Sequence, residues 1–96
     1  DMVLYVEAIG KVCTVYMMNR TMVIRQPIIV LETQFPKQFC RIHRSYLVNC
    51  RFVLQVERYS VTLINGTVLP VPAKRYMEVR EKITALIKNE NQEANT

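Results

Sequence analysis

The sequence predicts a single, mainly β domain of short antiparallel strands, with one short internal helix and one C-terminal helix. Short runs of β-branched and aromatic residues alternate with turn residues along most of the chain, which is typical of β structure. Only residues 73–88 carry a long apolar stripe at helical spacing. The length of 96 residues fits one domain, and 50% of them are hydrophobic, so the chain can build a core of its own.

The alternating residues 2–18 predict a β-hairpin whose turn contains Gly10. Glycine can adopt the positive φ that such a turn requires. Lys11 is then at or just past the tip, where it can reach a partner or be an ordinary solvated turn residue. Residues 19–20 predict a second turn, and residues 22–25 predict a short third strand.

A short helix is predicted over residues 27–35, where apolar residues recur at helical spacing. Pro27 suits the first turn of a helix, because the N–H that proline lacks has no partner there. Pro36 ends the pattern. Ile29 and Val30 are also apolar, so a strand remains the alternative for this segment.

Residues 39–49 combine an apolar and aromatic frame with strong positive charge. The only histidine of the chain, His43, lies here between Arg41 and Arg44. Because burying an unpaired charge is costly, we expect the frame to hold Arg44 toward solvent or an anionic partner. We expect His43 to hydrogen-bond the backbone and so to shape the loop that carries Arg44.

Further β structure is predicted by residues 52–58, a strand, and by residues 61–69, a hairpin. The pair Asn65-Gly66 in the middle of the hairpin favours a two-residue type I′ turn. Pro70 and Pro72 limit the last strand, because proline cannot donate to a sheet ladder.

Residues 73–88 predict the one long helix, whereas residues 89–96 lack apolar anchors and predict a flexible tail. The folded domain is therefore expected to cover residues 1–88. The first turn of the helix carries Lys74 and Arg75, which have the wrong sign for the positive end of a helix dipole. Free N–H groups and cationic side chains at one helix start favour an anion.

The net charge of +5 indicates an anionic partner, nucleic acid before a membrane surface, although charge alone fits a merely soluble basic domain equally well. The excess is concentrated in residues 37–58, which carry five basic residues and one acidic residue. Eight of the thirteen basic residues are arginine, whose planar fork suits phosphate and guanine. No transmembrane stretch or signal peptide is visible, so we expect a cytoplasmic location.

Enzyme and metal chemistry are not expected. The only aspartate is Asp1, which nearly excludes aspartate-dependent catalysis and aspartate-rich metal sites. Ser45 near His43 suggests a nucleophile, but no carboxylate stands at a spacing that would orient the histidine. One histidine and three separated cysteines form no zinc pattern, so we expect reduced, packed thiols and no cofactor; the cysteines are Cys13, Cys40 and Cys50.

Residues 39–49, Phe-Cys-Arg-Ile-His-Arg-Ser-Tyr-Leu-Val-Asn, resemble the signature of LytTR-type DNA-binding domains, the effector domains of many bacterial response regulators. The resemblance covers nearly the whole chain, including residues 5–11 and residues 65–76. It implies an elongated LytTR-like β-sandwich that places loops in successive major grooves of double-stranded DNA. It also implies binding to direct repeats as a homodimer, and a receiver domain upstream in the full-length protein.

The resemblance assigns DNA contacts as well. Arg44 follows the motif histidine and occupies a contact position of the family. Lys11 belongs to the loop after the first strand, with Cys13 close to another contact position. Lys74, with Arg75 beside it, belongs to the segment before the last helix.

Further phosphate contacts are predicted for Arg41 and Arg51, and structural support of the DNA-binding loop for His43 and Asn49. The family commonly has serine where this chain has Pro72, which leaves the register of the following basic pair open.

The sequence therefore predicts a sequence-specific DNA-binding domain of a bacterial transcriptional regulator, namely the output domain of a two-component response regulator. The alternative is a basic protein-interaction module that docks an acidic partner. A salt titration on random-sequence DNA separates the two, because binding to DNA releases counterions and weakens steeply with salt.

Overall fold

The computed structural model describes residues 2–94, with side chains as far as Lys88. The strands are β1 (Val3–Ile9), β2 (Val12–Met17), β3 (Thr21–Ile24), β4 (Phe39–His43), β5 (Tyr46–Asn49), β6 (Val53–Glu57), β7 (Ser60–Leu63) and β8 (Val68–Pro70). The helices are α1 (Ile28–Glu32), the 3₁₀ helices η1 (Cys50–Phe52) and η2 (Ala73–Arg75), and α2 (Tyr76–Ala94). The predicted mainly β fold with a short internal helix and a C-terminal helix is confirmed.

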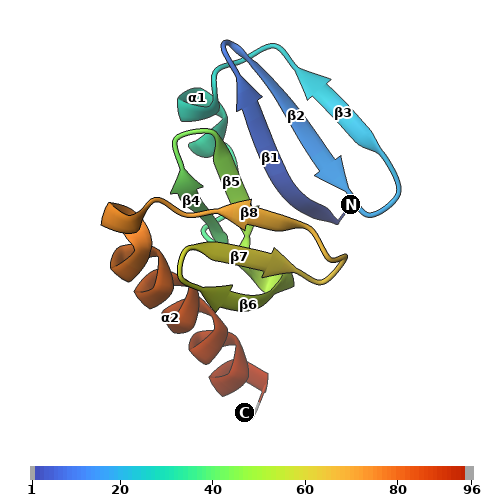
Figure 1. The fold of residues 1–96 in the computed structure, drawn as a ribbon. Helices are drawn as coiled ribbons and strands as arrows, with labels where there is room; N and C mark the ends of the chain where they lie inside the picture. Colours follow the sequence, from blue (N-terminus) through green and yellow to red (C-terminus); the bar gives the residue numbers. More distant parts are fainter. Residues whose placement is uncertain (1, 95–96) are drawn as a thin grey trace.

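The strands form two antiparallel sheets (Figure 1). The larger sheet has the strand order β3-β2-β1-β5-β4, and the smaller sheet has the order β6-β7-β8. In the larger sheet β1 pairs with β2 on one side and with β5 on the other. Two hairpins that are far apart in the sequence, β1–β2 and β4–β5, are therefore neighbours.

Two clusters of buried residues hold the layers together. Ile28 and Leu31 of α1 pack on one face of the larger sheet, and α2 and the smaller sheet pack on the β4–β5 part of the other face. Successive residues of a strand point to opposite faces, so Leu47 joins the α1 cluster and Val48 joins the α2 cluster. The molecule measures 39 × 31 × 25 Å along its principal axes and is moderately elongated.

Two hairpin turns depend on glycine. Gly10 has a φ of +63° in the two-residue β1–β2 turn, as predicted. The prediction of a two-residue type I′ turn at Asn65-Gly66 is wrong, because that turn needs a positive φ at both residues and only Gly66, at +90°, has one. The loop has three residues: the Leu63 N–H bonds the Thr67 carbonyl at 2.8 Å, and the Gly66 N–H bonds the Leu63 carbonyl at 2.9 Å. This is the pattern of a type I turn followed by a left-handed residue.

Both predicted helices are present with different bounds. α1 ends at Glu32, because a helix of about one turn has little stability of its own and extends only as far as its packing holds it. α2 continues to Ala94, so the predicted helix end at residue 88 is wrong. An established helix gains a backbone hydrogen bond with each added residue and needs no apolar anchor for the next one. Residues 95–96 of the predicted tail lie outside the described residues.

Candidate nucleic-acid interface

The turn between β4 and β5 consists of Arg44 and Ser45, and Arg44 is exposed. The flanking residues pair across the hairpin, His43 with Tyr46, and the register shifts between Arg41 and His43. The frame around the turn is buried, with Ile42 at 0% and Leu47 at 1% exposure. The hairpin therefore presents one arginine at its tip, as the cost of burying charge predicted.

Arg41 braces the backbone of this turn from inside the hairpin. Its Nε donates to the His43 carbonyl at 3.0 Å, and its Nη2 donates to the Arg44 carbonyl at 2.6 Å. Its Nη1 forms an ion pair with Glu32 of α1 at 2.8 Å. Because one rigid guanidinium ties two carbonyls to α1, the position of the turn is set by tertiary contacts. The predicted phosphate contact of Arg41 stays a prediction, and the geometry favours a supporting role.

His43 holds the other side of the turn. Its Nδ1 accepts a hydrogen bond from the Ser45 N–H at 3.0 Å, and its ring lies against that of Tyr46, with the centroids 5.3 Å apart. Burial lowers the pKa of His43, and Arg44, Arg75 and Arg41 lower it further in that order. A neutral ring is the form that can accept at Nδ1, so the charge environment and the hydrogen bond favour the same state. The backbone hydrogen bond expected of His43 is therefore observed, with the Ser45 N–H as its donor.

Lys11 lies exposed in the β1–β2 turn, next to the β4–β5 turn. The β4–β5 turn is bonded to β1 close to the β1–β2 turn, because the Ala8 N–H of β1 donates to the Ser45 carbonyl at 2.8 Å. The sheet register alone brings them together, since Glu7 of β1 pairs with Tyr46 of β5.

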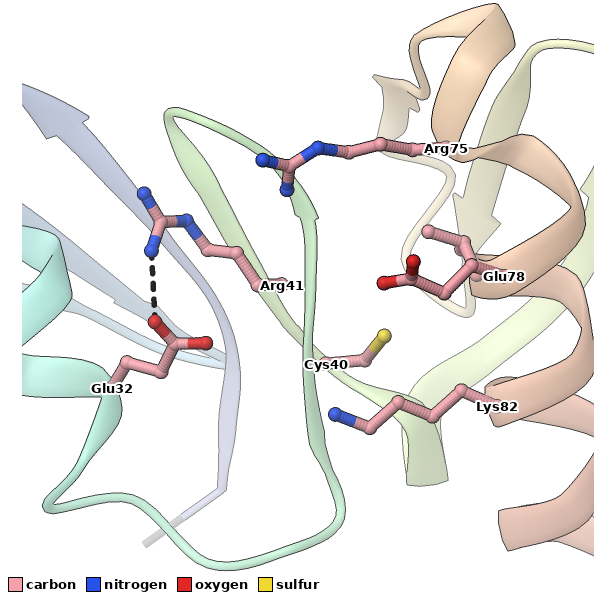
Figure 2. Close-up of a pocket in the computed structure, with 7 residues that line it drawn as sticks. Glu32, Cys40, Arg41, Arg75, Glu78 and Lys82 are labelled. Atoms are coloured by element: carbon pink, nitrogen blue, oxygen red, sulfur yellow. Dashed lines mark hydrogen bonds and ion pairs between the residues drawn. The ribbon is translucent and has the colours of Figure 1, made fainter.

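A third cationic segment, η2, reaches the same region from the start of α2. Lys74 is exposed and Arg75 is half-buried. Figure 2 shows the Arg75 side chain extending toward the β4–β5 hairpin, where it is close enough to His43 to lower its pKa. A cavity of about 370 Å³ lies between α1, β4 and α2, lined by Glu32, Cys40, Arg41, Arg75, Glu78, Val79 and Lys82.

These three segments follow one another along one edge of the molecule. In Figure 1 the β1–β2 turn, the β4–β5 turn and the start of α2 succeed each other along the upper left side. Their exposed cations are Lys11, Arg44 and Lys74, with Arg75 half-buried beside them. Together with the η2 backbone, they give an extended basic edge rather than a closed pocket, which suits a long polyanion.

Two predicted site residues lie at the opposite end of β5. The Asn49 side chain is 4% exposed, donates to the Val3 carbonyl at 2.9 Å, and accepts from the Arg51 N–H at 3.1 Å. The predicted support of the DNA-binding loop by Asn49 stays a prediction, and the observed hydrogen bonds of Asn49 tie the start of β1 to η1 at the far end of the strand. Arg51 is exposed there, away from the basic edge.

The predicted DNA contact of Cys13 is wrong for its side chain. Cys13 has 0% exposure and packs in the α1 cluster with Val15 and Leu31. Side chains alternate along a strand, and the phase of β2 turns Cys13 inward while its neighbours Val12 and Thr14 face the other side of the sheet. Burial raises the pKa of the Cys13 thiol.

A polar network behind the Arg44 turn did not emerge from the sequence. Glu7 accepts hydrogen bonds from the Tyr16 hydroxyl at 3.1 Å and from the Tyr46 hydroxyl at 3.0 Å. Tyr5 stacks on Tyr16, with ring centroids 4.4 Å apart, and burial with these neighbours raises the pKa of Tyr5 to about 12. The network links β1, β2 and β5, and Tyr46 carries it to the His43 ring. The only sign of this network in the sequence was that Tyr5 and Glu7, two residues apart in a predicted strand, lie on the same face.

The comparisons with known proteins give the family of the chain. A family model described as the LytTr DNA-binding domain matches residues 1–84. The chain belongs to the LytTr DNA-binding domain family. DNA is therefore the class of partner that its family membership implies.

Four chains among the solved structures match this LytTr domain. One is the LytTr DNA-binding domain of a methyl-accepting/DNA response regulator from Bacillus cereus, with a TM-score of 0.72 and 26% identity, over 85% of this chain and 80% of that one. No curated protein matches. Within residues 2–94, no helix has the length and apolar content needed to cross a membrane.

Proposed function

We propose that this LytTr domain is the sequence-specific output domain of a bacterial response regulator, and that it inserts its turns into successive major grooves of DNA. The observation that carries the proposal is the basic edge, where Lys11, Arg44 and Lys74 are exposed on three segments that the fold aligns. The similarity to a response-regulator domain supports the context.

Arg44 is the proposed base reader. A two-stranded hairpin fits the major groove of B-DNA, which is about 12 Å wide, and an arginine at its tip can bond guanine O6 and N7 together. The backbone contacts of the turn support this role. The planar guanidinium must meet two acceptors at once, so it gains most from a backbone that is held in place. The contacts that fix the turn are those of Arg41 and His43.

Lys11, Lys74 and Arg75 are the proposed flanking contacts, mainly to phosphates. Lysine is a flexible point charge and needs no braced backbone to meet a phosphate. The molecule is 39 Å long, comparable to one turn of B-DNA at about 34 Å. Two copies on direct repeats would then read one face of the duplex, which is the homodimer on DNA that the family resemblance implies.

Selection of bound sites from a random DNA pool tests the proposal as a whole. We expect recovered sites to contain a pair of direct repeats at a spacing of whole helical turns. Recovery of unrelated sequences that bind equally well would show that the domain binds DNA without specificity.

Electrophoretic titration of Arg44→Ala on the selected site tests the reader. We expect a loss of about 1–3 kcal/mol in binding and a relaxed preference at one base position. Arg44→Lys keeps the charge but loses the fork, so it should also relax that position. Arg51→Ala is the matched control at the other end of β5 and should change binding by less than about 0.5 kcal/mol.

Lys11→Ala separates phosphate contacts from base contacts. We expect the slope of the logarithm of the binding constant against the logarithm of the salt concentration to fall in magnitude by about 1, with the base preference unchanged.

An Arg44→Ala protein that keeps its full site preference would exclude Arg44 as the residue that reads the base.

A further inference from the structure

Two of the three cysteines lie together at the base of the β4–β5 hairpin. Cys40 is the second residue of β4 and pairs with Val48 of β5, while the Cys50 N–H donates to the Gln38 carbonyl at 2.9 Å. Cys40 and Cys50 therefore occupy diagonal positions on neighbouring segments. Both are 2% exposed and belong to the cluster beneath α2.

The two thiols share one buried cluster. The hydrogen bond with the Cys50 thiol lowers the pKa of Cys40, and the nearby Lys82 ammonium acts in the same direction, against burial and against Glu78 and Glu32. Thiolate is the reactive form of cysteine. The third thiol, Cys13, lies in the other cluster, where burial raises its pKa.

Cys40 also borders a cavity. The cavity of about 370 Å³ between α1, β4 and α2 is lined by Cys40 but not by Cys50. In Figure 2 the Cys40 sulfur points toward Glu78 and Lys82 of α2 at the wall of this cavity. A molecule as small as a hydroperoxide can enter a space of this size, whereas a bulky reagent would have to open the packed cluster.

We infer that Cys40 and Cys50 form an oxidation site, in which Cys40 reacts with a hydroperoxide and Cys50 resolves the product as an intramolecular disulfide. The Cys40 thiolate attacks one peroxide oxygen, the O–O bond breaks, and Cys40 becomes a sulfenic acid while the other oxygen leaves as water or an alcohol. The Cys50 thiol then attacks the Cys40 sulfur, and the sulfenic hydroxyl leaves as water. The two thiols lose two electrons and two protons, and the peroxide is reduced.

The cross-link would close residues 40–50, with the Arg44 turn near the middle of the loop. Cys40 and Arg41 are adjacent on β4. Drawing the strand toward Cys50 would therefore also shift the backbone of Arg41, whose side chain bonds the turn. The oxidation chemistry itself does not depend on the proposed DNA contacts.

Peptide mapping of the folded, reduced protein tests this inference. The protein is treated with hydrogen peroxide, unreacted thiols are alkylated, and the digest is analysed by mass spectrometry. We expect a peptide pair joined through Cys40 and Cys50 that has lost two hydrogens, and Cys13 still open to alkylation after unfolding. The Cys40–Cys50 pair should react faster than Cys13, since the thiolate is the reactive form, and the pKa of Cys40 is lowered while that of Cys13 is raised.

Single variants assign the two roles. In Cys50→Ser the sulfenic acid should persist on Cys40 and be trapped by dimedone, whereas in Cys40→Ser neither Cys50 nor Cys13 should be labelled. In denaturant the three thiols of the unsubstituted protein should react at similar rates, which shows that the fold causes the selectivity. Equal oxidation of Cys13 in the folded protein, or disulfides only between molecules, would overturn the inference, and the mapping of the unsubstituted protein decides this even if a variant fails to fold.

Discussion

At one end of β5 the turn of residues 44–45 exposes an arginine side chain, and at the other end Asn49 is 4% exposed. At both ends of β5, side chains form hydrogen bonds with the backbone. Arg41 and His43 bond the backbone of the turn and leave Arg44 open to solvent. Asn49 bonds the backbone of two other segments and leaves no side chain of its own on the surface.

The difference shows how one short segment serves both function and stability. A functional end needs a fixed backbone and a free charged tip, so the bracing groups must come from other residues. A structural end needs its own polar group buried with all its partners, because an unsatisfied buried group costs about 1–3 kcal/mol. Substitutions at the two ends should therefore affect different measurements.

Asn49→Ala should have the largest effect, on stability. It would leave the Val3 carbonyl and the Arg51 N–H without their partner, so we expect the free energy of unfolding to fall by about 2–3 kcal/mol. Urea denaturation measures this. Asn65→Ala is the control, because Asn65 is exposed and makes one hydrogen bond, to the Thr67 N–H. Site preference of the folded Asn49→Ala protein should stay as it was, and a changed preference would contradict the separation of the two ends.

Arg41→Met should affect both binding and stability, because it removes the brace but leaves Arg44 in place. We expect losses of about 1–2 kcal/mol in DNA affinity and in unfolding free energy, in line with hydrogen bonds from a charged donor. Glu32→Gln is the matched comparison, since it weakens only the partly exposed ion pair and keeps both bonds to the turn; it should cost less than about 1 kcal/mol. Equal effects of the two substitutions would mean that the ion pair, and not the turn, is what Arg41 serves.

The smallest expected effect is a pH dependence from His43. Its pKa is lowered in the folded state, whereas in the unfolded chain it titrates near about 6.5. As the pH falls below about 6.5, His43 of the unfolded chain becomes protonated while His43 of the folded protein is still neutral. The free energy of unfolding should therefore decrease below about pH 6.5, and His43 should not affect it above that pH. Urea midpoints at a series of pH values would measure this. His43→Asn keeps an acceptor near the Nδ1 position but does not titrate, so this part of the pH dependence should disappear.

Local sequence signals predicted the elements whose cause is local. Gly10 allowed a positive φ, Pro27 marked the start of a helix, and the charge of Arg44 kept it out of the core. The Asn65-Gly66 pair located a turn but not its type, because glycine also suits the left-handed residue after a type I turn. The family resemblance, confirmed over residues 1–84, supplied the class of partner.

The sequence by itself thus determined the β class, the two helices, the basic character of the chain and the exposed arginine of the signature. Only the tertiary structure decided which polar residues close to Arg44 in the sequence hold the backbone of its turn. Arg41 is committed to the turn because α1 brings Glu32 to it, Asn49 belongs to the far end of β5, and Cys13 is buried by the phase of β2. Composition and spacing could not separate these residues, since a strand with period two turns a side chain inward or outward with a shift of one residue.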